Sequence, residues 1–265
     1  CPTSQYLSSL LVGCPLAEGD TAITVPLLNE APYVEMTCDW LRHRGIRFEA
    51  KKNFSRVLIP GGQHYSDFRA EIPADFSSAT FFLVAAAITS SELLLRGLDM
   101  DDSQGDRAVV WMLEEMGCEV ETGDEGVRIR GPERLSGGEF DLNATPDALP
   151  AMAVAGCLAE GETRLVNVPQ ARDKETDRIS AMAQELRKMS GDVEELDAGM
   201  VLRGGRLSGA EVDSRHDHRI AMALAVAGLA AEDYTVVTGA ECTSVTFPTF
   251  AELMQQAGAD LEVSE

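Results

Sequence analysis

The chain has 265 residues, of which 45% are apolar and 25% are charged. These values are typical of one large or two smaller globular domains, and they exclude a disordered chain. Lys and Arg number 22 and Asp and Glu number 44, so the formal net charge is −22. A surface this acidic repels polyanions, which argues against binding to nucleic acid or to anionic membranes.

Lysine is scarce, with four residues against eighteen arginines. Many carboxylates with few lysines favour a halophilic source, because salt screens the mutual repulsion of the carboxylates. The same composition also arises in an ordinary acidic protein from a GC-rich genome, where Arg replaces Lys.

The six cysteines form no C-x-x-C pair: Cys1, Cys14, Cys38, Cys118, Cys157 and Cys242. We therefore expect free, mostly buried thiols in a reducing, cytoplasmic compartment, and no disulfide framework or zinc site. The longest apolar stretch, 220–231, is too short to cross a bilayer. The first residue is not Met, and we expect the chain to be part of a longer protein.

One type of segment occurs four times in chain order, as a small-residue helix, a polar turn and a β-branched strand. Its copies are residues 4–25, 77–97, 147–168 and 218–239. Their equivalent residues Val12, Val84, Val154 and Val226 are 72, 70 and 72 positions apart. Regular spacing of this kind predicts a repeated structural unit.

A second type of segment alternates with the first, as an amphipathic helix, a glycine and a strand. Its copies are residues 39–50, 111–122, 185–196 and 252–263, with Gly45, Gly117, Gly191 and Gly258 after the helices. We expect each glycine to take the left-handed conformation that ends a helix. After the first three copies, residues 56–62, 127–133 and 200–206 predict the second strand of a hairpin.

The repeat is therefore an α-β-α-β-β unit of about 70 residues, as the valine spacing shows. A helix that is apolar on nearly every face belongs inside. We predict an α/β fold with the Ala-rich helices at the centre and the sheets outside.

Unusual polar residues lie at the starts of the Ala-rich helices: Thr3-Ser4-Gln5, Asp75 with Ser77-Ser78, Asn143 with Asp147, and His216-Asp217-His218-Arg219. Free N–H groups and the helix dipole make such ends suitable for phosphate or carboxylate. Capping explains Ser77-Ser78 better, whereas His218 and Arg219 are not cap formers. We expect no metal site, because His216 and His218 have no evident third ligand.

A second cluster, residues 172–178, combines alternating charges with one of the four lysines. The cluster is either a solvated charged face or an anion site with an acid/base carboxylate among cations. No motif for a nucleotide or nicotinamide occurs, so no cofactor is expected.

The chain resembles 5-enolpyruvylshikimate-3-phosphate (EPSP) synthases, specifically their C-terminal three-fifths. The motifs that carry the resemblance are Lys174-Glu175-Thr176-Asp177-Arg178 and Asp217-His218-Arg219-Ile220-Ala221-Met222, supported by Ser4-Gln5, Pro32-Tyr33, Asp75–Ala79, Gln104-Gly105-Asp106, Pro146-Asp147-Ala148 and Thr246-Phe247-Pro248. The resemblance implies an enolpyruvyl transferase fold of repeated β-α-β-α-β-β units. Residues 1–73 would be an incomplete remainder of the first domain, and 74–265 a nearly complete second domain.

The family transfers the enolpyruvyl group of phosphoenolpyruvate to the 5-hydroxyl of shikimate 3-phosphate and releases phosphate. The resemblance implies that Asp147 and Glu175 are the catalytic acid and base, with their division of roles left open. It implies that shikimate 3-phosphate contacts Thr3, Ser4, Gln5, Asp147, Gln170 and Lys174. Phosphoenolpyruvate would contact Gln5, Arg178, His218 and Arg219. These residues should lie around one open surface, and we expect a monomer at full length.

Three positions depart from the family pattern. Val245 stands where Lys is frequent, Glu30 where a substrate-binding Ser is usual, and Gln170 where Asn is usual. Two other interpretations remain: a UDP-N-acetylglucosamine enolpyruvyl transferase, which shares the repeat, and a noncatalytic folded fragment. We expect the chain alone to be inactive.

Overall fold

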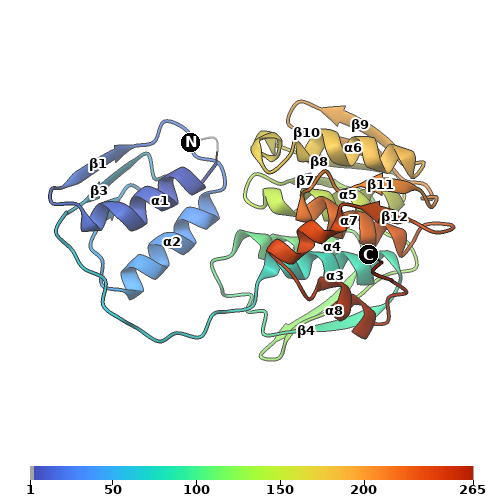
Figure 1. Cartoon of the computed structure of the whole chain (residues 1–265), viewed down its shortest axis with the longest axis horizontal. Coiled ribbons are helices and arrows are strands. Elements are labelled where there is room, and N and C mark those ends of the chain that lie inside the picture. The colour runs from blue at the N-terminus through green and yellow to red at the C-terminus, as the bar shows by residue number, and fades with distance from the viewer. Residues whose placement is uncertain (1–2, 265) are drawn as a thin grey trace. The chain divides into compact units, whose positions relative to one another are not determined.

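The computed structural model describes residues 3–264 and divides the chain into two compact units (Figure 1). Unit 1 comprises Cys1–Ile72 and Asp101–Gly105, and unit 2 comprises Pro73–Met100 and Asp106–Glu265. The assignment of unit 1 to the remainder of a first domain stays a prediction.

Unit 1 is a small α/β layer. Its helices are α1 (Gln5–Gly13), η1 (Cys14–Leu16) and α2 (Ala31–His43), and its strands are β1 (Thr21–Thr24), β2 (Glu49–Ala50) and β3 (Arg56–Ile59). The strands form an antiparallel sheet in the order β1-β3-β2. Leu7 and Leu11 of α1 pack with Val34 and Cys38 of α2 in its apolar core.

Unit 2 repeats one helix–sheet arrangement. Its long helices are α3 (Phe76–Ile88), α4 (Ala108–Glu115), α5 (Leu149–Leu158), α6 (Arg178–Lys188), α7 (His218–Gly228) and α8 (Phe250–Gln256). Short 3-10 helices are η2 (Gly105–Arg107), η3 (Pro146–Ala148), η4 (Pro169–Asp173) and η5 (Ala240–Val245).

Three sheets surround these helices. The first has the order β4-β6-β5, the second β7-β8-β10-β9 and the third β11-β12. The strands are β4 (Glu92–Arg96), β5 (Glu119–Gly123), β6 (Gly126–Arg130), β7 (Glu139–Asp141), β8 (Glu162–Val166), β9 (Asp192–Leu196), β10 (Gly199–Arg203), β11 (Glu211–Asp213) and β12 (Val236–Thr238). The pairs β5–β6 and β9–β10 are the antiparallel hairpins that the sequence predicts.

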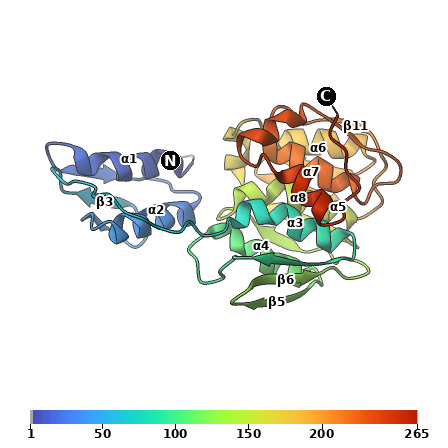
Figure 2. The same ribbon diagram turned by 60° about the horizontal axis from the view of Figure 1, so that its bottom comes forward.

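The Ala-rich helices α3, α5 and α7 contact one another at the centre of unit 2, and the sheets lie outside them (Figures 1 and 2). Figure 2 shows β5 and β6 below α3 and α4. Nine of the ten residues of α5 are buried, because small side chains let neighbouring backbones approach from every side. The predicted α/β fold with central Ala-rich helices is confirmed.

The four repeat valines do not share one environment. Val84, Val154 and Val226 are fully buried, whereas Val12 is 49% exposed. Helices α3, α5 and α7 pack together, while α1 packs on α2 within unit 1. Sequence periodicity therefore identifies equivalent positions, but burial depends on what packs against them.

Two local predictions are wrong. Gly45, Gly117 and Gly258 have positive φ angles, but after α6 the left-handed residue is Ser190 (φ 68°) and not Gly191. An added Cβ at Gly191 would lie 2.9 Å from the Leu186 carbonyl oxygen, so this glycine is needed for a close approach. Residues 259–263 form no strand, and within residues 3–264 no strand pairs with them.

The cysteines that the structure describes are free thiols. Cys38, Cys118 and Cys157 are buried, and burial raises the pKa of each thiol, to about 11 for Cys38 and about 12 for the other two. Cys14 and Cys242 are half-buried, and Cys1 lies outside the described residues. None of the helices in residues 3–264 is long and apolar enough to span a membrane.

Candidate active site

Three helix starts in unit 2 carry four of the predicted site residues. Asp147 lies in η3, directly before α5. Arg178 is the first residue of α6, and His218 and Arg219 are the first two residues of α7. Because the positive ends of helix dipoles attract anions, these starts favour negatively charged groups.

Aspartate caps fix the first turns of these helices. The Asp177 carboxylate accepts from the Ser180 backbone N–H at the start of α6. Asp217 accepts from the Arg219 N–H at the start of α7. At α3, the N-cap is Asp75, which accepts from the N–H groups of Ser77 and Ser78 in the first turn of the helix. Each cap fixes the backbone that carries the neighbouring site side chains.

Arg178 is the centre of an ionic network. Its guanidinium is 1% exposed and donates from Nη1 to Asp147 (2.8 Å), from Nη2 to Glu175 (2.6 Å) and from Nε to Asp217 (2.7 Å). Burial alone lowers the pKa of Arg178, but Asp147 and Asp217 outweigh it and raise the pKa, so the group stays charged. A buried guanidinium needs partners of this kind, since unpaired it would be very costly.

Asp147 contacts all three cations of the site. Besides Arg178, Arg219 Nη2 lies 3.1 Å and Lys174 Nζ 3.8 Å from its carboxylate oxygens. Burial raises the pKa of Asp147, but Arg219, Arg178 and Lys174 together lower it to about 2. The carboxylate is therefore ionised at neutral pH and can accept a hydrogen bond from a substrate hydroxyl.

His218 is buried beside this network. Burial and the nearby charge of Arg219 lower the pKa of its imidazole. The ring is consequently neutral near pH 7, where it can donate or accept a hydrogen bond without adding charge.

Gln170 lies in η4 and is also buried. Its Nε2 donates to the Asn143 carbonyl oxygen (3.0 Å), whereas its buried Oε1 has no hydrogen-bond partner in residues 3–264. A buried amide oxygen without a partner is an available acceptor for a donor on a ligand.

The structure thus brings together Asp147, Lys174, Glu175, Arg178 and Arg219 through direct ion pairs, with His218 next to Arg219 in the first turn of α7. Thr3, Ser4 and Gln5 belong to unit 1, at the start of α1. Their placement around one surface with the other residues stays a prediction. Val245, at the end of η5, is 80% exposed and adds no cation to the network.

Two contacts of the candidate site were not predicted. Asp217 was part of a recognised motif but had no assigned role, and it holds Arg178. Ser77 Oγ accepts from Arg219 Nη2 at 3.0 Å, in addition to being capped by Asp75. A signal did exist, because Asp75 and Asp217 both lie nine residues before a repeat valine, Val84 or Val226.

In unit 1, Glu30 takes up the donors of Ser4. The Glu30 carboxylate accepts from the Ser4 N–H (2.9 Å) and from Ser4 Oγ (2.7 Å), and Glu30 is 1% exposed. Its backbone is left-handed (φ 59°), which is uncommon for a residue other than glycine. Ser4 can therefore donate both hydrogen bonds to another anion only after the Glu30 carboxylate moves.

Comparison with known proteins decides the family. The family model described as EPSP synthase (3-phosphoshikimate 1-carboxyvinyltransferase) matches residues 2–254. The chain belongs to the EPSP synthase family. Among its relatives, the 3-phosphoshikimate 1-carboxyvinyltransferase of Acetivibrio thermocellus is 52% identical over 263 residues, which are 99% of this chain and 62% of the relative. The enzyme of the same name from Methanocella arvoryzae is 43% identical over 264 residues, 98% of this chain and 62% of the relative.

Solved EPSP synthases share the fold. The 2.37 Å structure of EPSP synthase from Acinetobacter baumannii matches with a TM-score of 0.82 and 31% identity, covering 99% of this chain and 62% of that one. This EPSP synthase family member therefore spans about 62% of the length of the relatives that it matches.

Proposed function

We propose that this chain forms part of an enzyme that transfers the enolpyruvyl group of phosphoenolpyruvate to the 5-hydroxyl of shikimate 3-phosphate. The observation that carries this proposal is the network in unit 2, where Arg178, Arg219 and Lys174 surround Asp147 and Glu175 is bound to Arg178. This chemistry requires cations for anionic substrates and carboxylates that orient or move protons. The relatives named above carry the name of this activity.

The half-exposed Glu175 is our candidate for proton transfer at the methylene carbon. In the addition step, the 5-hydroxyl gives its proton to a base and its oxygen bonds to C2 of phosphoenolpyruvate, while the C2–C3 π bond breaks and C3 takes up a proton from an acid. In the elimination step, C3 loses a proton, the C2–O bond to phosphate breaks, and the enol ether and phosphate are released. Glu175 is the most exposed carboxylate of the network, with 49% of its side chain accessible, so it can reach a bound ligand.

Asp147 is our candidate for binding the shikimate hydroxyls. A pKa of about 2 makes this carboxylate a strong hydrogen-bond acceptor site but a weak base near neutral pH. For Asp147 to act as the base for the 5-hydroxyl, bound substrate must move Arg219 or Lys174 away from it, because these cations keep its pKa low. We assign Lys174 and Gln170 to the same substrate, because Gln170 Oε1 is an available buried acceptor.

Arg178, Arg219 and His218 are our candidates for binding phosphoenolpyruvate. The positive charges of the network are balanced by its carboxylates: Lys174, Arg178 and Arg219 pair with Asp147, Glu175 and Asp217. An incoming anion therefore competes with a carboxylate already present. Glu175 is the carboxylate that an anion displaces most readily, since it is half-exposed. Thr3, Ser4 and Gln5 would contribute contacts from unit 1.

We also propose the finer properties that the sequence suggests. The chain would be the C-terminal three-fifths of a cytoplasmic, monomeric enzyme adapted to high salt. Its support is the net charge of −22, the scarcity of lysine and the coverage of 62% of the relatives. We expect the chain to be inactive when it is assayed by itself.

The test is an assay of phosphate release from phosphoenolpyruvate and shikimate 3-phosphate. The purified chain is assayed alone and then mixed with the 38% or so of the Acetivibrio thermocellus relative that this chain does not match, which by this proposal is its N-terminal part. We expect activity only in the mixture, and loss of that activity with Arg178→Met. Activity with UDP-N-acetylglucosamine as acceptor, or no activity in a mixture shown to form a complex, would refute the proposal.

A further inference from the structure

Glu185 is a fully buried carboxylate that the candidate active site does not use. It lies on α6, seven residues or about two helical turns after Arg178. Its Oε2 accepts from Lys188 Nζ (2.6 Å) and from the Asp213 backbone N–H (2.9 Å), and its Oε1 accepts from Arg215 Nη2 (2.8 Å). Burial raises the pKa of Glu185, but these hydrogen bonds outweigh it and lower the pKa, so the carboxylate is charged.

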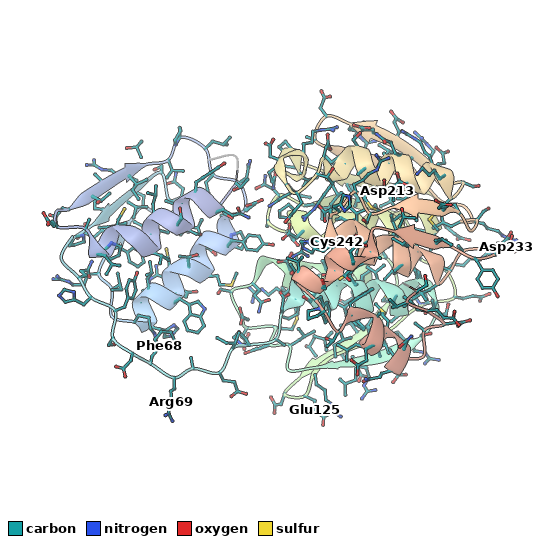
Figure 3. The ribbon with its side chains drawn as sticks, viewed as in Figure 1. Phe68, Arg69, Glu125, Asp213, Asp233 and Cys242 are labelled. Carbon is teal, nitrogen blue, oxygen red and sulfur yellow. The ribbon has the colours of Figure 1, made fainter. Side chains whose placement is uncertain are left out.

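Two of these contacts reach a different part of unit 2. Asp213, labelled in Figure 3, ends β11 where this strand contacts α6. Arg215 follows in the turn between β11 and α7, and its N–H donates to the Asp213 carboxylate (2.8 Å). Glu185 therefore accepts two hydrogen bonds from this turn, one from the backbone N–H of Asp213 and one from the side chain of Arg215.

The turn has an unusual backbone. Arg215 (φ 55°) and His216 (φ 57°) are consecutive left-handed residues, and neither is glycine. Such conformations cost free energy and persist only where surrounding contacts hold them. The turn also has contacts of its own, since the His216 N–H donates to Ser214 Oγ (3.1 Å) and Ser214 Oγ donates to the Gly239 carbonyl oxygen (2.9 Å).

The turn leads directly to the active-site network. Asp217 follows His216, caps α7 through the Arg219 N–H (2.8 Å) and accepts from Arg178 Nε (2.7 Å). Helix α6 therefore contacts this region at two points. Glu185 binds the turn, and Arg178 binds Asp217, which follows the turn. The direction in which Asp217 presents its carboxylate thus depends on a turn that Glu185 holds.

We propose that Glu185 is a positioning residue, which holds the Asp213–His216 turn so that Asp217 and Arg178 stay in register. Its relevance to catalysis rests on the proposed function, whereas its effect on the Arg178–Asp217 pair does not. Lys188 is the contrasting partner of Glu185. It binds the same carboxylate from the same helix, but within residues 3–264 it makes no contact with Asp213 or Arg215.

The test measures the Arg178 Nε proton by 15N NMR in the 265-residue chain, since this proton lies in the bond to Asp217. Arg215→Met and Lys188→Met form a matched pair, because each removes one cation from Glu185 and both side chains are about 40% exposed. Glu185→Gln removes the charge itself. Val109→Ala, a core truncation in α4, controls for general loss of stability.

We expect Arg215→Met and Glu185→Gln to speed exchange of the Arg178 Nε proton with water by about tenfold or more, the effect of losing one charge-assisted contact. Lys188→Met and Val109→Ala should change it less than about twofold, as for surface pairs and distant sites. Equal effects of Arg215→Met and Lys188→Met, or no effect of Arg215→Met, would overturn the proposal. Arg215→Met decides the question even if Glu185→Gln does not fold.

A titration of the same signal with phosphoenolpyruvate separates this inference from the proposed function. If wild-type chain shows no response to phosphoenolpyruvate but Arg215→Met still speeds exchange selectively, the substrate assignment of Arg178 fails and the positioning role stands. If the wild-type signal responds and the variants exchange alike, the positioning role fails alone.

Discussion

Arg178 Nε and Asp217 Oδ2 lie 2.7 Å apart, and both side chains are excluded from solvent. They are 39 residues apart in the sequence, and Arg178 begins α6 whereas Asp217 caps the start of α7. The same guanidinium also binds Glu175, which is half-exposed. One buried cation therefore joins a deeply buried carboxylate to one that can reach a ligand.

Asp217→Asn should destabilise the fold strongly. The variant leaves the buried Arg178 charge without its closest buried partner, and breaking such a pair typically costs about 3–5 kcal/mol. Urea denaturation measures the loss. Glu175→Gln is the control, because it removes a half-exposed partner of the same guanidinium and should cost less than about 1 kcal/mol. Similar losses for both variants would show that burial does not govern this pair.

Glu175→Gln in the active complex should slow turnover much more than it weakens binding of shikimate 3-phosphate. Loss of a group that moves protons typically slows the reaction by about 10²–10⁴-fold, because the group acts in the transition state. Steady-state kinetics separate kcat from KM. Glu194→Gln is a suitable control, since Glu194 is half-exposed and pairs with Arg203 on the neighbouring strand of its sheet. An unchanged kcat with a raised KM would contradict the role.

Glu30→Ser should improve binding of a phosphate-bearing ligand at Ser4. The carboxylate of Glu30 now takes both Ser4 donors, and its charge repels another anion. Charge-assisted hydrogen bonds of about 1.5–3 kcal/mol correspond to roughly 10- to 100-fold in affinity. The 15N shift of the Ser4 amide, titrated with shikimate 3-phosphate, gives the dissociation constant.

Glu35→Gln is the matched control for this substitution, because Glu35 lies on the same helix α2 but is exposed. It should leave the affinity unchanged. Equal or weaker binding by Glu30→Ser would show that the carboxylate is part of the binding site and not a competitor.

Asp147 should make stability depend on pH in the acidic range. Its pKa is about 2 in the folded chain, below the value of about 3.9 for an unfolded aspartate. A lowered pKa stabilises the fold above pH 4 or so, and this contribution is lost as pH falls from about 4 to about 2. The difference corresponds to roughly 2–3 kcal/mol.

Denaturation of the wild type and Asp147→Asn at several pH values checks this prediction. The stability difference between them should be largest at pH 5 and should shrink as the pH falls toward 2. A constant difference would mean that Asp147 titrates alike in the folded and unfolded chains.

Salt should stabilise the chain. With a net charge of −22, carboxylate repulsion acts against the compact state at low ionic strength. In about 1 M salt the Debye length falls to about 3 Å, and most of this repulsion is screened. We expect a higher Tm in molar KCl than in dilute buffer. An unchanged Tm would remove the basis for adaptation to high salt.

Much of the architecture could be predicted from the sequence, because it depends on local patterns. The spacing of Val84, Val154 and Val226 gives the repeat, and their helices are apolar on all faces and therefore central. Asp75 caps α3 within its own chain segment. Arg178 was identified as a ligand candidate through the family resemblance that the motif 174–178 carries.

Tertiary structure alone decided which of these residues act on one another. Asp217 meets Arg178, Glu30 meets Ser4, and Glu185 meets Arg215 across 26 to 39 residues of chain. No periodicity specifies these pairs, because side chains distant in sequence come into contact only when helices and turns pack.

Packing also changed local outcomes that the sequence suggested. Ser190 takes the left-handed position expected of Gly191, and Gly191 is needed instead for a close approach, since an added Cβ there would lie 2.9 Å from the Leu186 carbonyl oxygen. Val12 is equivalent to the buried repeat valines, yet half of its surface is accessible on α1, which packs on α2 in unit 1. Sequence by itself determined the repeated elements and the residues at helix starts, since these follow from short-range patterns. Burial, charge pairing and the pKa of Asp147 depend on neighbours that only the folded chain supplies.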